Sequence, residues 1–269
     1  MRRLWFLAAA TIAAAVSFTP TTPAAEGDWS TVKGQVKFPE GKAVPERKKL
    51  DVSQDKEHCL SKGDILDESL IVNPKTKGIK NVVVWLRIDS DVKDDLKKKL
   101  PEDKIHPSDK ERKPAKITID QPCCMFVKRI TLARVGDTLV AKNPAPVPHN
   151  FFWSSTNNGE FNQTIVKEGE FALPDPLKAE ASPIAFKCTI HPWMSGYVRV
   201  FDHPYYAVTD EDGKFEIKNA PVGKFRMVVW QEKQGFLGGA PGRFGIPVEI
   251  KAGTTELKTV EFDIKSDEK

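Results

Sequence analysis

The stretch CTIHPWM, residues 188–194, places a thiol, an imidazole and a thioether within seven positions. In a straight β-strand alternate side chains point to opposite faces, so Cys188, His191 and Met194 could not all point to one atom. Pro192 has no backbone N–H and favours a tight loop over a continued strand. The stretch therefore predicts a loop on which these three side chains converge.

Strand-like segments occupy most of the chain around this loop. They are short, rich in β-branched or aromatic residues, and bounded by Gly, Pro, Asn or Asp. No apolar period of 3.6 residues persists for more than about ten residues, which argues against long helices. We therefore predict an all-β fold of the sandwich type from the segments 81–88, 129–143, 183–188, 196–202, 214–221, 224–231 and 257–264.

The N-terminus has the pattern of a secretory signal peptide. Arg2 and Arg3 precede an apolar run over residues 4–18, which small residues and Pro follow. The run is shorter than the ~20 residues that a membrane span needs. We expect residues 1–25 to be removed, with cleavage near Ala24 or Ala25, and an exported mature chain, periplasmic or extracellular, without a membrane span. The alternative is an uncleaved N-terminal anchor.

The charge balance excludes one class of partner. The 269 residues include 41 basic and 37 acidic ones, and removal of the signal peptide brings these counts closer together. A nearly balanced surface gives no case for nucleic-acid binding. The densest charges, in residues 91–116, mix both signs with prolines and indicate a solvent-exposed segment between strands.

The loop at 188–194 leaves a metal site one ligand short, and the most promising of the five histidines is His149. It lies in NPAPVPHNF (143–151), directly after the strand-like GDTLVAKN (136–143). Gly-Asp-Thr, then Asn, then Pro-His-Asn, followed at 188–196 by Cys-x2-His-x2-Met-x-Gly, resembles the cupredoxin family of type 1 copper proteins. The spacing is most similar to that of the amicyanins.

The resemblance covers residues 115–202 and implies a Greek-key β-sandwich that binds one type 1 copper ion. It implies His149, Cys188 and His191 as strong ligands and Met194 as a weak axial ligand. It also implies that Asn150 ties the two ligand loops together by hydrogen bonds. The sequence departs from many relatives at Lys187, before the Cys, and at three prolines of the His149 loop. Neither departure removes a ligand.

Two other interpretations of these residues remain open. Each residue could be an ordinary buried thiol, thioether or loop histidine. Zinc is the chemical rival of copper, since it takes one Cys and two His at a tetrahedral site, although Met is a poor zinc ligand.

The flanking segments resemble a carboxypeptidase regulatory-like, transthyretin-type β-sandwich. Residues 30–46 and 79–88 are similar to its first strands, and 206–232 and 248–264 to its last. We therefore expect this domain to be discontinuous, over 27–90 and 203–265, with a charged linker at 91–114 and the cupredoxin domain at 115–202. The alternative is two domains in tandem, with residues 27–110 donating strands to the cupredoxin.

Three cysteines lie outside the predicted metal loop, and in an oxidising compartment a pair of them is expected to form a bridge. Cys124 begins a Cys-x-Phe spacing that matches the position of a bridge before the first strands of the family. We therefore predict a disulfide between Cys59 and Cys124. The alternatives are a bridge between Cys59 and Cys123, or three free thiols.

The resemblance implies an exported carrier of single electrons and not an enzyme, since no second His cluster exists to bind the further coppers of an oxidase. A redox protein such as a c-type cytochrome or a periplasmic dehydrogenase is the expected partner. We expect it to dock on an apolar rim of Pro192, Trp193 and Phe151, with Pro146 and Pro148, around an exposed edge of His191. The alternatives are a copper store and a cell-envelope interaction module in which the metal is structural.

Overall fold

The structure is a computed structural model and describes residues 26–264, so the predicted signal peptide lies outside the described residues. Strands dominate, and the two α-helices, α1 (Lys56–Cys59) and α2 (Pro107–Lys110), have four residues each. The predicted all-β class is therefore confirmed. Within the described part of the chain no helix has the length and apolar character needed to cross a membrane.

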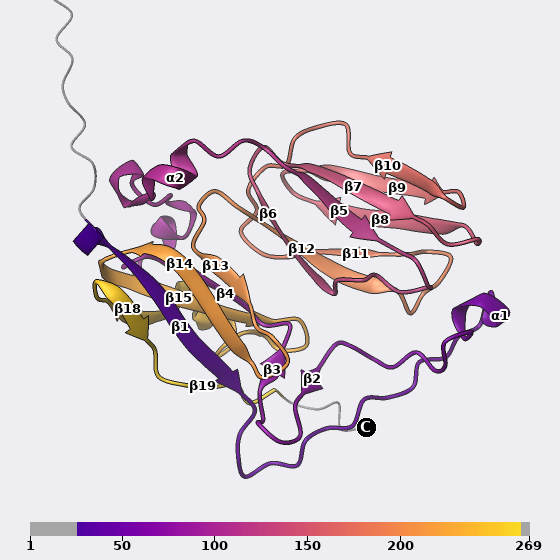
Figure 1. The fold of residues 1–269 in the computed structure, drawn as a ribbon, viewed down its shortest axis with the longest axis horizontal. Coiled ribbons are helices and arrows are strands. Elements are labelled where there is room, and N and C mark those ends of the chain that lie inside the picture. The colour runs from indigo at the N-terminus through magenta and orange to yellow at the C-terminus, as the bar shows by residue number, and fades with distance from the viewer. Residues whose placement is uncertain (1–25, 265–269) are drawn as a thin grey trace, which may run out of the picture.

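The first of two β-sandwiches takes its strands from both ends of the described chain (Figure 1). One sheet has the order β14-β1-β18, with β19 also paired to β1, and the other has the order β13-β4-β15-β16, with β17 also paired to β15. The bounds are β1 (Trp29–Lys37), β4 (Val83–Ile88), β13 (Tyr206–Val208), β14 (Lys214–Pro221), β15 (Gly223–Gln231), β16 (Gly235–Phe236), β17 (Ile246–Ile250), β18 (Gly253–Glu256) and β19 (Val260–Glu261). A small hairpin joins β2 (Ile71–Val72) and β3 (Ile79–Lys80).

The second sandwich is formed by the middle of the chain. Its sheets have the orders β10-β7-β5 and β6-β12-β11-β8-β9. The pairs β5–β7 and β6–β12 are parallel and the others are antiparallel. The bounds are β5 (Lys116–Asp120), β6 (Ile130–Arg134), β7 (Thr138–Asn143), β8 (His149–Ser155), β9 (Gly159–Ile165), β10 (Gly169–Ala172), β11 (Ile184–Lys187) and β12 (Ser195–Phe201).

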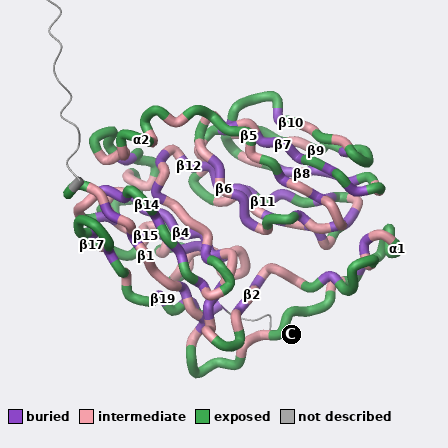
Figure 2. The backbone as a smooth tube through the Cα atoms, in the orientation of Figure 1, coloured by how far each residue is buried: buried purple, intermediate pink, exposed green. Residues whose placement is uncertain are grey.

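Strand β4 is buried on both faces, which explains its nearly continuous apolar sequence. Side chains alternate along a strand, so Val84 and Leu86 enter the core of the first sandwich. Val83 and Trp85 point the other way, to a separate apolar cluster with Ile130 of β6. Alternate residues of strand β15 likewise lie in the core of the first sandwich and in the cluster that contains Ile130. Buried stretches accordingly lie along these strands in Figure 2.

This shared cluster joins the two sandwiches, and a buried ion pair stands beside it. Arg129 donates from Nε and Nη2 to the carboxylate of Glu232 at 2.8 and 2.5 Å. The two side chains are 12% and 4% exposed. Arg129 also donates to the backbone oxygen of Ser195, the residue after Met194, at 3.0 Å. The first sandwich therefore holds, through Arg129, the start of β12 and the end of the predicted metal loop.

One segment packs differently from the sequence expectation. Residues 50–65, here called the strap, fall within the predicted outer domain at 27–90. Val52, Cys59 and Ile65 instead enter the core of the second sandwich, and Leu50 and Leu60 pack against it. In Figure 1 the chain leaves the first sandwich after β1, runs out to α1, and returns to β2. The domain boundaries otherwise stay a prediction.

The charged segment at 91–114 contains only short helical turns besides α2. They are η2 (Lys93–Lys97) and η3 (Glu102–Lys104). Two further 3-10 turns lie in the first sandwich, η1 (Glu26–Asp28) and η4 (Ala240–Phe244).

Replacing Glu232 by Gln should lower the free energy of unfolding by on the order of 3 kcal/mol, because it leaves the charge of Arg129 buried without its counter-ion. Urea denaturation followed by tryptophan fluorescence measures this loss. Glu216→Gln is the matched control, since its ion pairs with Lys33, at 3.9 Å, and with Lys218, at 3.4 Å, are both exposed. An equal effect of the two substitutions would contradict a structural role for the buried pair.

Candidate metal centre

Strand pairing brings the two predicted ligand segments together. Cys188 directly follows β11, and His149 is the first residue of β8. These strands are antiparallel neighbours, with Lys187 opposite Phe152. The end of β11 therefore lies beside the start of β8, and the sheet places Cys188 next to the His149 segment.

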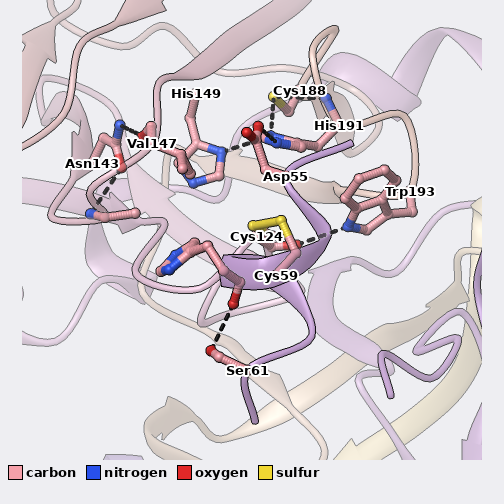
Figure 3. Close-up of a disulfide and its surroundings, with 12 residues drawn as sticks. Asp55, Cys59, Ser61, Cys124, Asn143, Val147, His149, Cys188, His191 and Trp193 are labelled. Carbon is pink, nitrogen blue, oxygen red and sulfur yellow. Dashed lines mark hydrogen bonds and ion pairs between the residues drawn. A yellow bond between two sulfur atoms is a disulfide. The ribbon is translucent and has the colours of Figure 1, made fainter. Parts of the chain in front are cut away.

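The side chains of His149, Cys188 and His191 meet in one buried cluster. The two Nδ1 atoms of His149 and His191 are 3.0 Å apart, and the Sγ atom of Cys188 lies 3.7 Å from Nδ1 of His191. The three ligand atoms lie within 4.8 Å of one another, and all three residues are 0% exposed. Figure 3 shows the two rings and the thiol directed toward each other. The structure thus brings together three of the four predicted ligands.

The loop at 188–194 closes on itself, as Pro192 led us to expect. The N–H of Met194 donates to the oxygen of His191 at 2.9 Å, and the N–H of Cys188 donates to the oxygen of Met194 at 3.1 Å. The N–H of His191 points to the sulfur of Cys188 at 3.4 Å. Met194 is 2% exposed and shares a core with Cys188. The fourth predicted ligand therefore lies buried on the same closed loop.

Asn150 connects the two ligand segments in the way the resemblance implied. Its backbone N–H donates to the sulfur of Cys188 at 3.2 Å, and its side-chain oxygen accepts from the N–H of Thr189 at 3.2 Å. Its Nδ2 donates to Asn162 of β9 at 2.9 Å. The thiol and the loop that follows it are thus tied to β8.

Asn143 organises the proline-rich segment before His149, a role that the sequence did not reveal. Its side chain donates to the backbone oxygens of Val147, Ile165 and Val166 at 2.9–3.1 Å and accepts from the N–H of Ala145 at 3.0 Å. The residue is 0% exposed. Its position between a strand and a Pro-rich loop is the only sequence signal for this function, since Asn commonly bonds to the backbone in turns.

The surroundings of Cys188 favour the thiolate. Burial alone would raise the pKa of this thiol, but hydrogen bonds from the imidazoles of His149 and His191 and from two backbone N–H groups outweigh burial and lower the pKa to about 6. For His191 burial acts in the opposite direction and lowers the pKa, because it disfavours the charged ring. The contacts of His191 with Cys188 and Asp55 outweigh burial, and the net effect is a raised pKa. A thiolate ready to bind a metal therefore faces two imidazole nitrogens.

Three potential ligand atoms, two imidazole nitrogens and one sulfur, face one another in this cluster. His191 Nε2 lies 2.9 Å from a carboxylate oxygen of Asp55, which accepts a hydrogen bond from a proton on Nε2. Loss of the Nδ1 proton that His191 shares with the Cys188 sulfur then leaves an Nδ1 lone pair that faces the cluster. A metal ion that displaces the protons shared in this cluster would bind both Nδ1 atoms and the thiolate. One Cys and two His with a nearby Met fit copper, and without the Met they fit zinc.

The expected docking rim is wrong in two of its parts. Phe151 is 0% exposed and belongs to the core, because it points inward from β8. The edge of His191 is not exposed either, because Asp55 of the strap lies against it. Trp193 is half-buried and donates from Nε1 to the oxygen of Cys124 at 3.1 Å. Pro192 is exposed, as are Pro146 and Pro148.

The structure contains the predicted disulfide between Cys59 and Cys124, and Cys123 is free. The bridge spans 65 residues, which corresponds to about 4 kcal/mol on the chain-entropy model. It fastens α1 of the strap to the second sandwich, close to Trp193 (Figure 3). Asp55, which sequence reasoning missed, lies at the start of α1 and is therefore held near the site.

No family model matches the chain, and no curated protein matches it. Among solved structures, a Cu(I) methionine-to-alanine variant of amicyanin is 26% identical, and the match covers 32% of this chain and 82% of that chain with a TM-score of 0.28. A reduced tryptophan-to-tyrosine variant is 25% identical over 34% and 88%, with a TM-score of 0.29. An oxidised proline-to-alanine variant is 26% identical over the same shares, also with a TM-score of 0.29. These likenesses concern about a third of the chain.

Replacing Asn150 by Ala should lower the metal affinity of the site by about 10–100-fold, because the side chain that ties Thr189 to β8 is lost. Titration with Co²⁺, whose thiolate charge-transfer absorption reports binding, measures the change. Asn162→Ala removes only the outer bond to Asn150 and serves as the control. If both variants bind Co²⁺ as tightly as the native protein, Asn150 does not organise the site.

Proposed function

We propose that the protein is an exported type 1 copper protein that passes single electrons between redox partners. His149, Cys188 and His191 would hold one copper ion, with Met194 as the weak axial ligand. The observation that carries this proposal is the fully buried cluster of two imidazoles and a low-pKa thiol on two strand-connected loops. Copper bound there supplies a centre that accepts and releases one electron.

The donor atoms suit both oxidation states of such a centre. The thiolate of Cys188 and the thioether of Met194 are soft ligands that favour Cu(I), while imidazole serves Cu(I) and Cu(II). The hydrogen bonds of Asn143 and Asn150 fix the ligand loops through backbone contacts that do not depend on a metal. Ligands held in this way move little when the charge changes, and small movement makes electron transfer fast.

The burial of the three donors excludes bulk water from the site. An enzyme would bring a substrate to its metal, whereas the three donors here are 0% exposed. We therefore propose a carrier and not an oxidase. A redox protein such as a c-type cytochrome or a periplasmic dehydrogenase is the proposed partner.

The disulfide and the signal-like N-terminus support export to the periplasm or the extracellular space. The first sandwich, whose strands come from both sides of the copper-binding segment, is proposed to be the transthyretin-type domain. Glu232 of this sandwich binds Arg129, and Arg129 donates to the oxygen of Ser195, the residue directly after the metal loop. The first sandwich therefore helps to fix the end of the loop.

The copper-loaded protein should show the intense visible absorption of a thiolate bound to Cu(II) and lose it reversibly on reduction. Cys188→Ser should abolish this absorption, because serine offers no thiolate. Met194→Leu should keep the colour and shift the reduction potential, because a weak axial ligand tunes the metal without holding it. Absorption spectroscopy and cyclic voltammetry make both measurements.

Two results would count against this function. A Cys188→Ser variant that stays blue would show that another residue binds the copper. A native protein that binds copper tightly but gives no such absorption, and no reversible redox wave, would favour the copper store or the structural metal.

A further inference from the structure

Asp55 makes a contact with His191 that neither the strand pattern nor the metal loop accounts for. Its Oδ2 atom lies 2.9 Å from Nε2 of His191, although the two residues are 136 positions apart. The His191 side chain is 0% exposed, whereas that of Asp55 is 36% exposed. Asp55 therefore stands between the imidazole and the solvent (Figure 3).

Asp55 precedes α1 but does not cap it. Asp55 occupies the N-cap position of α1, where an Asp side chain normally accepts a hydrogen bond from the first turn. It makes no such bond, and its backbone is left-handed, with φ 45° and ψ 37°. Asp is one of the few residues other than glycine that adopt this conformation regularly. The helix-capping bond is therefore absent in the conformation that directs the carboxylate to His191.

The position of Asp55 is fixed by anchors on either side. Val52 is buried in the second core three residues before it, and Cys59 is bonded to Cys124 four residues after it. The disulfide sulfurs lie within 4.8 Å of a ring nitrogen of His191. Trp193, two residues beyond His191, donates to the oxygen of the same Cys124. The strap and the metal loop are therefore attached to one point.

We infer that Asp55 is a positioning residue for His191, an inference that rests on the proposed copper function for its redox part. The carboxylate accepts a hydrogen bond from the Nε2–H group of His191 and so keeps the proton of the neutral ring on Nε2. The Nδ1 lone pair then points to the metal position, and His191 is a stronger ligand. Its negative charge, one imidazole away from the metal, stabilises the more positive oxidation state. It also closes the edge of His191 to direct contact with a partner, so a partner meets Asp55 and Pro192 instead.

Two substitutions at Asp55 separate the effect of its charge from the effect of its hydrogen bond to His191. Asp55→Asn removes the charge but retains an oxygen that accepts from Nε2, while Asp55→Ala removes both. Asp64→Asn is the control, because Asp64 is an exposed carboxylate of the same strap that pairs with Lys49. Neither position is a proposed metal ligand.

The first measurement uses the metal-free protein under mildly alkaline conditions and needs no copper. Long-range ¹⁵N–¹H NMR should show His191 as the Nε2–H tautomer in the native protein and in the Asp64→Asn control. The Asp55→Ala variant should populate the Nδ1–H tautomer and bind Co²⁺ about 10–100-fold more weakly. An unchanged tautomer and unchanged Co²⁺ affinity in Asp55→Ala would overturn the inference.

The second measurement is the reduction potential of the copper-loaded variants. Asp55→Asn should raise the potential relative to the native protein and to Asp64→Asn, because Cu(II) loses a nearby negative charge. A potential equal to that of the control would overturn the electrostatic part. If the native protein shows no reversible redox wave, the proposed electron-carrier function fails, while the tautomer and Co²⁺ results still decide the positioning role.

Discussion

The antiparallel pairing of β8 with β11 is the constraint on which the candidate metal centre depends. The opposition of Lys187 and Phe152 places Cys188, the residue after β11, level with Phe151, two residues from His149 at the start of β8. A shift of the register by one residue would send every side chain of one strand to the other face and separate Cys188 from His149. The apolar side chains of Phe151, Trp153 and Phe186, which fill the core between the sheets, fix this register.

Three sets of contacts around this pairing hold the candidate ligands in place. Asn143 and Asn150 hold the His149 segment and the thiol from within the second sandwich. Arg129, bound to Glu232 of the first sandwich, holds the start of β12 just beyond the metal loop. The strap closes the remaining side through Asp55.

The sequence was sufficient for the fold class and for a loop that carries Cys188, His191 and Met194, because that information is local, whereas His149 was predicted from the family resemblance. The spacing of Cys188, His191 and Met194 and the proline at 192 describe one tight loop, and the alternation of apolar residues describes the strands. Asp55 could not be found in this way. Its role arises because the strap packs on the core of the second sandwich, which is formed by residues far away in the sequence. Nothing in the residues near Asp55 indicates that its carboxylate contacts His191. The same strap explains why the expected exposure of His191 was wrong, and the inward face of β8 explains the error for Phe151.

X-ray absorption spectroscopy of the copper-loaded protein, in the oxidised and the reduced state, is the most direct test of the central claim that this buried cluster is a rigid copper site. The account predicts two nitrogen neighbours and one sulfur neighbour at bonding distance in both states, with only small changes in distance between them. A copper ion without a sulfur neighbour, or one whose set of ligands changes on reduction, would contradict it.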